Sequence, residues 1–103
     1  MDAVDGLSVR VEQNGHGPVV RLSGELDIAT SPMLSECLER LDGQAVMVDF
    51  SDVTFIDSSG LAVLVNHHKQ TGAGKLMLQG VQPALMKVFE LTGLDEVFDF
   101  EGN

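Results

Sequence analysis

The segment from Val46 to Val65 constrains the fold of this chain more than any other. It opens on an apolar-rich run, 45–50, which predicts a buried β-strand. A short acidic turn is expected next, and then Asp57-Ser58-Ser59-Gly60 precedes a stretch that is apolar at 61, 64 and 65. Short oxygen-bearing side chains accept hydrogen bonds from the unpaired N–H groups of a helix's first turn, so Asp57 and Ser58 predict a helix start. Two serine hydroxyls therefore stand where a strand passes into a helix, a place where α/β folds put their sites.

Apolar periodicity and turn residues predict the remaining elements. Apolar residues alternate with polar ones over 7–11 and again at 20–22, and a turn-forming cluster at 14–18 joins them, so these segments predict an antiparallel hairpin. Thr30 or Ser31 is expected to cap a first helix, with Pro32 near its first position and Gly43 just past its end. The pattern predicts a second helix over about 58–71, a strand over 75–79, a third helix from Pro83 that stops at 92–94, and a last strand over 97–100.

This order, β-β-α-β-α-β-α-β, predicts an α/β fold with a small mixed sheet. The N-terminal hairpin is antiparallel, the later strands follow parallel βαβ crossovers, and the helices lie mainly on one side. One segment is ambiguous, because Leu61 to Val65 is apolar on every side and rich in β-formers. Its polar entrance and the polar continuation from Asn66 to Gln70 favour a helix. With no linker or repeat, residues 1–103 are interpreted as a single domain whose core spans about 7–100.

The charge of the chain excludes several classes of partner. Its 103 residues carry 16 acidic and 6 basic side chains, a formal net charge of −10. Such a surface repels phosphate backbones and anionic lipids, so neither nucleic acid nor a membrane is expected as a partner. The first residues lack the basic start and apolar core of a signal peptide, and no apolar run approaches 18 residues. We therefore expect a cytoplasmic protein.

The residues that could carry catalysis are poorly placed for it. His67 and His68 lie eight to ten residues beyond the serines on the same predicted helix, roughly 12–15 Å away. The serine segment also lacks the G-x-S-x-G elbow of hydrolases. We therefore expect no catalytic residue, no cofactor and no enzymatic activity.

Other chemically suggestive residues have plainer interpretations. Adjacent helical residues do not face each other, so the His67-His68 pair predicts a solvated pair and no metal site. The turn-like 71–75 segment resembles a phosphate loop, but Leu76 follows Lys75 where Ser or Thr belongs. Cys37, the only cysteine, lies in a helical apolar stripe and is interpreted as a buried small hydrophobe. Asp27 follows the second strand and is expected to be a solvated loop carboxylate without a capping role.

Three motifs in order resemble the STAS domain, and within it the stand-alone anti-sigma factor antagonists of bacteria. They are Gly24-Glu25-Leu26-Asp27, the segment from Asp49 to Leu61 that contains Asp57-Ser58-Ser59-Gly60, and Leu91-Thr92-Gly93-Leu94. The resemblance covers about residues 7–100. It changes the interpretation of the serines, which in an arbitrary sequence would be helix caps alone.

The resemblance implies a partner switch. An unphosphorylated antagonist of this family binds an anti-sigma factor that is also a serine kinase with a histidine-kinase-like ATPase fold, and binding frees a sigma factor. The kinase phosphorylates the first serine of the motif, here Ser58, and a PP2C-type phosphatase reverses the modification. The second serine, Ser59, is structural, and Asp27 lies beside the phosphoacceptor. The implied partner-binding residues are Asp27, Thr30, Asp57, Ser58, Ser59, Gly60, Leu61, Thr92 and Gly93.

Two other functions stay open on the sequence alone. The same fold could serve as an unphosphorylated scaffold or accessory subunit of a stress-signalling or transporter complex. A small nucleotide-binding or hydrolysing protein is a third interpretation, and the missing phosphate loop and base argue against it.

Overall fold

The chain forms a six-stranded sheet with three α-helices in a computed structural model that describes residues 2–4, 6–72 and 75–101. The strands are β1 (Asp2–Val4), β2 (Leu7–Asn14), β3 (Gly17–Leu26), β4 (Val46–Ile56), β5 (Leu76–Gln79) and β6 (Asp99–Glu101). The helices are α1 (Ser31–Arg40), α2 (Ser58–Thr71) and α3 (Pro83–Leu91), with a short 3-10 helix, η1, at Leu94–Glu96. Residues 73–74, inside the predicted 71–75 turn, lie outside the described residues.

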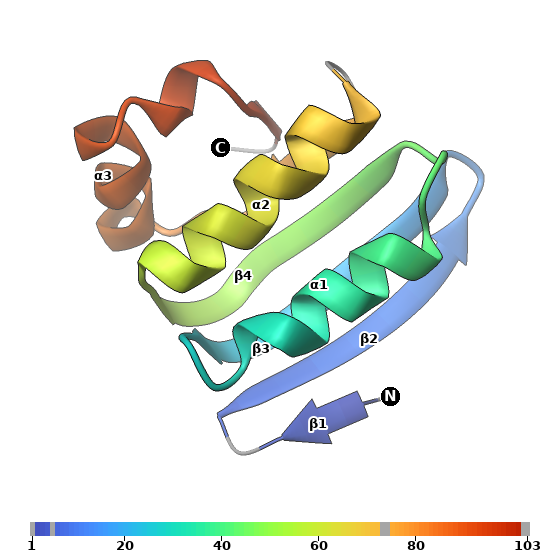
Figure 1. Ribbon diagram of the computed structural model, residues 1–103, viewed down its shortest axis with the longest axis horizontal. Coiled ribbons are helices and arrows are strands. Elements are labelled where there is room, and N and C mark those ends of the chain that lie inside the picture. The colour runs from blue at the N-terminus through green and yellow to red at the C-terminus, as the bar shows by residue number, and fades with distance from the viewer. Residues whose placement is uncertain (1, 5, 73–74, 102–103) are drawn as a thin grey trace.

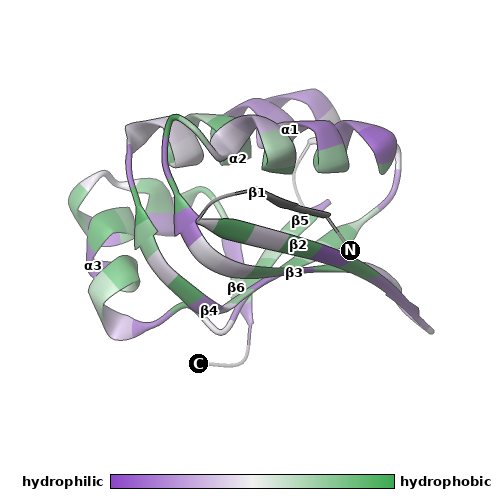
Figure 2. Cartoon of the chain, turned by 90° about the horizontal axis from the view of Figure 1, so that it is seen from below, coloured by the Kyte–Doolittle hydropathy of each residue, from purple (hydrophilic) through white to green (hydrophobic). Residues whose placement is uncertain are grey.

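The strands lie in the sheet in the order of the sequence. β1, β2 and β3 pair antiparallel, and β3 through β6 pair parallel. Helices α1 and α2 lie side by side across the sheet, and α3 lies beyond α2 (Figure 1). Seen along its edge, the sheet carries α1 and α2 on one face (Figure 2). The predicted mixed sheet with its N-terminal hairpin is confirmed, while the short strand β1 was not predicted.

The core lies between the sheet and the helices. Alternate residues of the central strands point into it, including Val20 and Leu22 of β3 and Val48 and Phe50 of β4, all at most 3% exposed. Phe89 of α3 meets Phe50 edge to face, with ring centroids 6.3 Å apart. Cys37 is 2% exposed within this core, so its prediction as a buried small hydrophobe is confirmed.

Three predictions about local structure were wrong. β4 continues to Ile56 instead of ending at residue 50, because β3 keeps pairing with it through two register shifts and buries Val53 and Ile56. The last strand begins at Asp99, because Leu94–Glu96 first form a 3-10 turn. His67 is 5% exposed, not solvated, and His68 packs against Phe98 with ring centroids 5.7 Å apart. Burial lowers the pKa of His67, which favours its neutral form.

Gly24 of the first motif allows the end of β3 to bend toward the site. Its φ is +116°, and a Cβ there would lie 2.0 Å from the carbonyl oxygen of Gly6. The neighbouring Glu25 N–H donates to the same oxygen at 2.7 Å. Only glycine fits this close approach of two backbone segments. The motif therefore fixes where β3 delivers Leu26 and Asp27.

Replacing Gly24 tests this constraint. Gly24→Ala should destabilise the fold by at least about 2 kcal/mol, because it adds left-handed strain to a backbone collision. Gly15→Ala is the matched control, since a Cβ at Gly15 meets nothing within 4 Å. Urea denaturation of both variants measures the difference. Equal stability of Gly24→Ala and wild type would show that β3 does not depend on this approach.

Candidate functional site

The ends of β3 and β4 bring two distant segments of the sequence together. Leu26 pairs with Ile56 at the end of the parallel ladder, and the Asp57 N–H donates to the Leu26 carbonyl at 3.1 Å. The turn after β3 and the start of α2 are therefore neighbours, at the carboxyl ends of two parallel strands. This is the edge at which α/β sheets place ligands and partners.

Asp57 caps helix α2 as predicted. Its Oδ1 accepts hydrogen bonds from the Ser59 N–H at 2.9 Å, the Gly60 N–H at 3.4 Å and the Ser59 hydroxyl at 2.5 Å. The hydrogen bond from the Ser59 hydroxyl is the largest cause that lowers the pKa of Asp57 below its ordinary value. The carboxylate is thus held ionised at the helix entrance, where the helix dipole favours negative charge.

Gly60 and Leu61 lie beneath the site. A Cβ on Gly60 would stand 3.0 Å from the Cβ of Leu26 and 2.9 Å from Cγ1 of Ile56. The first turn of α2 can therefore press against the strand ends only with glycine at this position. Leu61 is 8% exposed and belongs to the core cluster. In this structure both residues shape the site from below.

The hydroxyl of Ser59 is committed to its neighbours. Each serine has one O–H to donate. Ser59 gives its proton to Asp57 Oδ1 at 2.5 Å, and Ser31 gives its proton to the Asp27 carbonyl at 2.6 Å. The two serine oxygens lie 3.3 Å apart, a contact between hydroxyls whose protons are already engaged. This chain of polar contacts joins the starts of α1 and α2.

Ser58 differs from Ser59 in both exposure and bonding. It is the first residue of α2 and its side chain is exposed. Within the described residues its hydroxyl has no hydrogen-bond partner. Of the two serines in the motif, Ser58 alone presents a free hydroxyl to solvent.

Asp27, which was expected to have no capping role, caps the turn before α1, and Thr30, which was expected to cap α1, makes no side-chain cap hydrogen bond. Asp27 Oδ1 accepts from the N–H groups of Ala29 and Thr30 at 3.0 and 3.1 Å, so this carboxylate caps the turn before α1. Thr30 occupies the N-cap position of α1 without a side-chain cap hydrogen bond. It is 1% exposed, and its hydroxyl instead donates to the Glu25 carbonyl at 2.7 Å and accepts from the Asp27 N–H at 2.9 Å. Thr30 thus stands at the predicted cap position, but the prediction of a side-chain cap by Thr30 or Ser31 was wrong, because their hydroxyls donate to the carbonyls of Glu25 and Asp27.

Thr92 and Gly93 lie on a different element. Gly93 has the left-handed φ of +77° predicted for the stop after α3, and the Thr92 hydroxyl donates to the Val88 carbonyl at 2.9 Å. Both residues are exposed. Within the described part of the chain, no hydrogen bond joins them to the start of α2.

Sequence reasoning missed Ser31 as a part of the site. It was considered only as a helix cap, whereas its hydroxyl joins the two helix starts. The only indication of this role in the sequence is that Ser31 lies four residues after Asp27. The contact depends on the pairing of β3 with β4, which no local pattern reveals.

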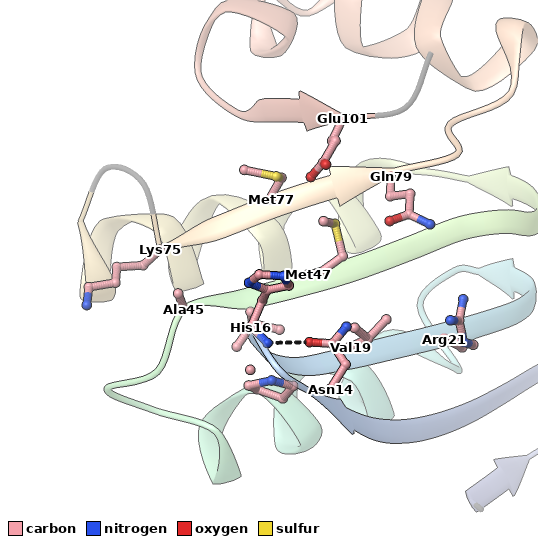
Figure 3. Close-up of a pocket in the computed structure, with 13 residues that line it drawn as sticks. Asn14, His16, Val19, Arg21, Ala45, Met47, Lys75, Met77, Gln79 and Glu101 are labelled. Atoms are coloured by element: carbon pink, nitrogen blue, oxygen red, sulfur yellow. Dashed lines mark hydrogen bonds between the residues drawn. The ribbon is translucent and has the colours of Figure 1, made fainter.

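A separate cavity of about 490 Å³ lies at the opposite end of β3 and β4 (Figure 3). Met47, Met77 and Val19 line it on the sheet face away from the core, together with His16 and Lys75. Arg21 on its wall is paired with Glu12 at 2.8 Å and with Asp49. This cavity has no residue in common with the serine site.

The described residues contain neither a metal-binding cluster nor a helix suited to span a membrane. No group of three or more His, Cys, Asp or Glu side chains suited to a metal ion occurs among residues 2–4, 6–72 and 75–101. In the same residues, no helix has the length and apolarity needed to cross a membrane.

The fold is that of the STAS domain, and the family model for that domain matches residues 8–103. The chain therefore belongs to the STAS domain family. It is 33% identical over 97 residues to the anti-sigma-B factor antagonist of Bacillus subtilis (strain 168), an alignment that covers 90% of this chain and 89% of that protein. Its homologues include anti-sigma factor antagonists, which agrees with the prediction of a regulatory, non-enzymatic protein.

Solved structures support the same placement. The crystal structure of an anti-sigma factor antagonist from Mycobacterium paratuberculosis matches with a TM-score of 0.85 at 28% identity, covering 100% of this chain and 92% of that one. The Bacillus cell fate determinant SpoIIAA in its phosphorylated form matches in fold, with a TM-score of 0.68 at 22% identity, covering 93% of each chain.

Asp57 yields a prediction about stability and pH. Asp57→Ala should lower the melting temperature at pH 7 by about 4–8 °C, because the first turn of α2 loses its acceptor. A carboxylate with a lowered native pKa stabilises the fold above the ordinary Asp pKa and loses that contribution as the pH falls through the native pKa. Asp57→Asn can still accept the N–H groups, so its deficit should shrink as the pH falls from 7 to 3. Thermal denaturation across this range measures both effects.

The matched control for this experiment is Asp52→Asn, on the exposed part of β4. The difference between Asp57→Asn and wild type should change more between pH 7 and pH 3 than the difference between Asp52→Asn and wild type. A deficit of Asp57→Asn that is the same at pH 7 and pH 3 would contradict an ionised cap at Asp57.

Proposed function

We propose that this chain is an anti-sigma factor antagonist controlled by phosphorylation of Ser58. The unphosphorylated protein binds, in the cytoplasm, an anti-sigma factor that is also a serine kinase with a histidine-kinase-like ATPase fold, and it thereby releases a sigma factor. Phosphorylation of Ser58 ends the binding, and a PP2C-type phosphatase restores it. The whole chain, 1–103, acts as one STAS domain.

The observation that carries this proposal is the contrast between the two serines. Ser58 is exposed with a free hydroxyl, whereas Ser59 gives its proton to Asp57. A kinase that approaches the helix entrance meets one available phosphoacceptor. Homology to anti-sigma factor antagonists supports the class of partner, and the phosphorylated form of SpoIIAA shows that a protein of this fold can carry the modification.

The charges around Ser58 support a switch by repulsion. A phosphate adds about −1.5 to −2 charge at pH 7. Asp57 is adjacent, Asp27 lies on the neighbouring turn, and neither is in an ion pair with any described residue. The capping N–H groups of Ser59 and Gly60 are already bonded to Asp57. The added charge therefore needs water, which a closely packed partner removes at a cost of several kcal/mol.

The partner-binding surface proposed here centres on the neighbouring turns 27–30 and 57–59. Asp27, Asp57, Ser58 and Ser59 face or border solvent there. Thr30, Gly60 and Leu61 are buried and support that surface. Thr92 and Gly93 belong to it if the partner extends to the end of α3.

The first test concerns the modified atom. Incubation of the chain with ATP and, one at a time, the histidine-kinase-like anti-sigma factors of its source genome should add one phosphate to Ser58. Ser59→Ala should still be modified, and Ser58→Ala should not. Tandem mass spectrometry locates the phosphate. Modification of Ser59 with Ser58 unmodified would contradict the assignment.

The second test concerns binding. Ser58→Asp should weaken binding of the same anti-sigma factor by at least about 2 kcal/mol, roughly 30-fold, because it adds a desolvated charge beside Asp57. Ser58→Ala should bind with nearly wild-type affinity, because it adds no charge. Isothermal titration calorimetry measures both. Wild-type affinity of Ser58→Asp would rule out the switch while leaving the fold assignment intact.

A further inference from the structure

The turn between β3 and α1, which adjoins the start of α2, presents an exposed isoleucine. Ile28 is 82% exposed, although most large apolar side chains of this fold are buried in the core. A single exposed apolar side chain is ordinary on a protein surface. Ile28 differs from an ordinary exposed residue in two respects: hydrogen bonds hold the turn that carries it, and that turn adjoins the site.

The turn that carries Ile28 is held rigidly. Asp27 Oδ1 accepts from Ala29 and Thr30 on the far side of Ile28, and the Asp27 carbonyl accepts from the Ser31 N–H at 2.8 Å. The buried Thr30 hydroxyl fastens the turn to Glu25 and Asp27. These bonds fix the backbone on both sides of Ile28. Because this backbone is fixed and a β-branched side chain has few rotamers, little conformational entropy is lost when a partner covers Ile28.

The turn that carries Ile28 adjoins the start of α2, where Ser58 lies. Leu26, two residues before it, accepts the backbone N–H of Asp57, which precedes Ser58. Ser31, three residues after it, contacts Ser59 at 3.3 Å. The turn is thus tied to the start of α2 on both sides of Ile28. A partner that covers Ser58 closely also covers Ile28.

The carboxylates around Ile28 indicate the charge of that partner. In both Asp27 and Asp57 the hydrogen bonds go to Oδ1. Among the described residues, neither Oδ2 atom has a hydrogen-bond partner. Two acceptor oxygens are therefore available on the two adjoining turns, in a chain of net charge −10. Lysine or arginine side chains complement them.

We infer that Ile28 is the apolar anchor of the partner interface, and that the anti-sigma factor receives it in an apolar socket bordered by Lys or Arg side chains. This inference rests on the proposed function. Central apolar anchors with a polar border carry most of the binding energy in many interfaces. A socket closed over Ile28 also excludes water from Ser58, which is the condition under which a phosphate there opposes binding.

Three variants test the anchor by isothermal titration calorimetry with the anti-sigma kinase that modifies Ser58 of the wild-type chain. Ile28→Ser should raise the Kd by about tenfold or more, because the buried apolar area is lost. Ile28→Leu keeps that area and should stay within about threefold of wild type. Val11→Ser is the matched control: Val11 is 44% exposed on β2 and pairs with Val20, well before the end of β3.

Phosphorylation kinetics provide a second readout. Ile28→Ser should raise the KM of the kinase reaction by about as much as it raises the Kd, with kcat nearly unchanged, because Ile28 contributes to binding alone. Its melting temperature should equal that of wild type, since the side chain is exposed.

The outcomes separate the anchor from the proposed function. If Ile28→Ser binds like wild type while Ser58→Asp does not bind, the anchor is wrong and the switch stands. Equal losses for Ile28→Ser and Val11→Ser would indicate a general effect and would also overturn the anchor. Failure of the wild-type chain to bind or be phosphorylated by any such kinase would overturn the proposed function, and the anchor with it.

Discussion

The pairing of the ends of β3 and β4 is the interaction on which the site depends. It places the Asp57 N–H on the Leu26 carbonyl and so joins segments thirty residues apart in the chain. Two glycines make the approach sterically feasible. Gly24 lets β3 bend against Gly6, and Gly60 lets α2 begin directly on Leu26 and Ile56. A side chain at Gly24 or Gly60 would push the two turns apart. The contact between Ser31 and Ser59 would then be lost.

Once the strand ends are paired, the polar residues of the site differ in whether their hydroxyls are hydrogen-bonded within the protein. Each hydroxyl has one proton, and the protons of Ser59, Ser31 and Thr30 go to Asp57, Asp27 and Glu25. These hydrogen bonds lie within the protein and hold the two turns in place. The hydroxyl of Ser58 makes no such hydrogen bond among the described residues, so a modification of Ser58 need not disturb the bonds that hold the turns. In the proposed switch, stability and regulation would therefore depend on different, neighbouring residues of the same motif.

Local patterns in the sequence predicted much of this architecture. The hairpin, the limits of α2 and the Asp57 cap follow from alternation and capping rules, which depend on neighbours in the chain. The errors came from long-range pairing. Ser51 and Asp52 are typical of a turn, yet β4 continues because β3 pairs beyond them. The capping role of Asp27 is not visible in the sequence, because the N–H groups that it caps become available only when the turn folds. His67 was predicted to be solvated, yet the packing of α1 on α2 buries it.

The same bonds also define what a phosphate on Ser58 encounters. A helix N-terminus ordinarily offers its free N–H groups to an anion. Here Asp57 already accepts from those of Ser59 and Gly60, so in the proposed switch a phosphate on Ser58 would find these two N–H groups already bonded. The helix keeps its cap, and the fold has no reason to rearrange. In the proposed switch the new charge would lie on the exposed surface next to Asp57, where it must keep its water. A partner that closes over this surface must remove that water, so the cost of phosphorylation falls on the complex and not on the folded chain.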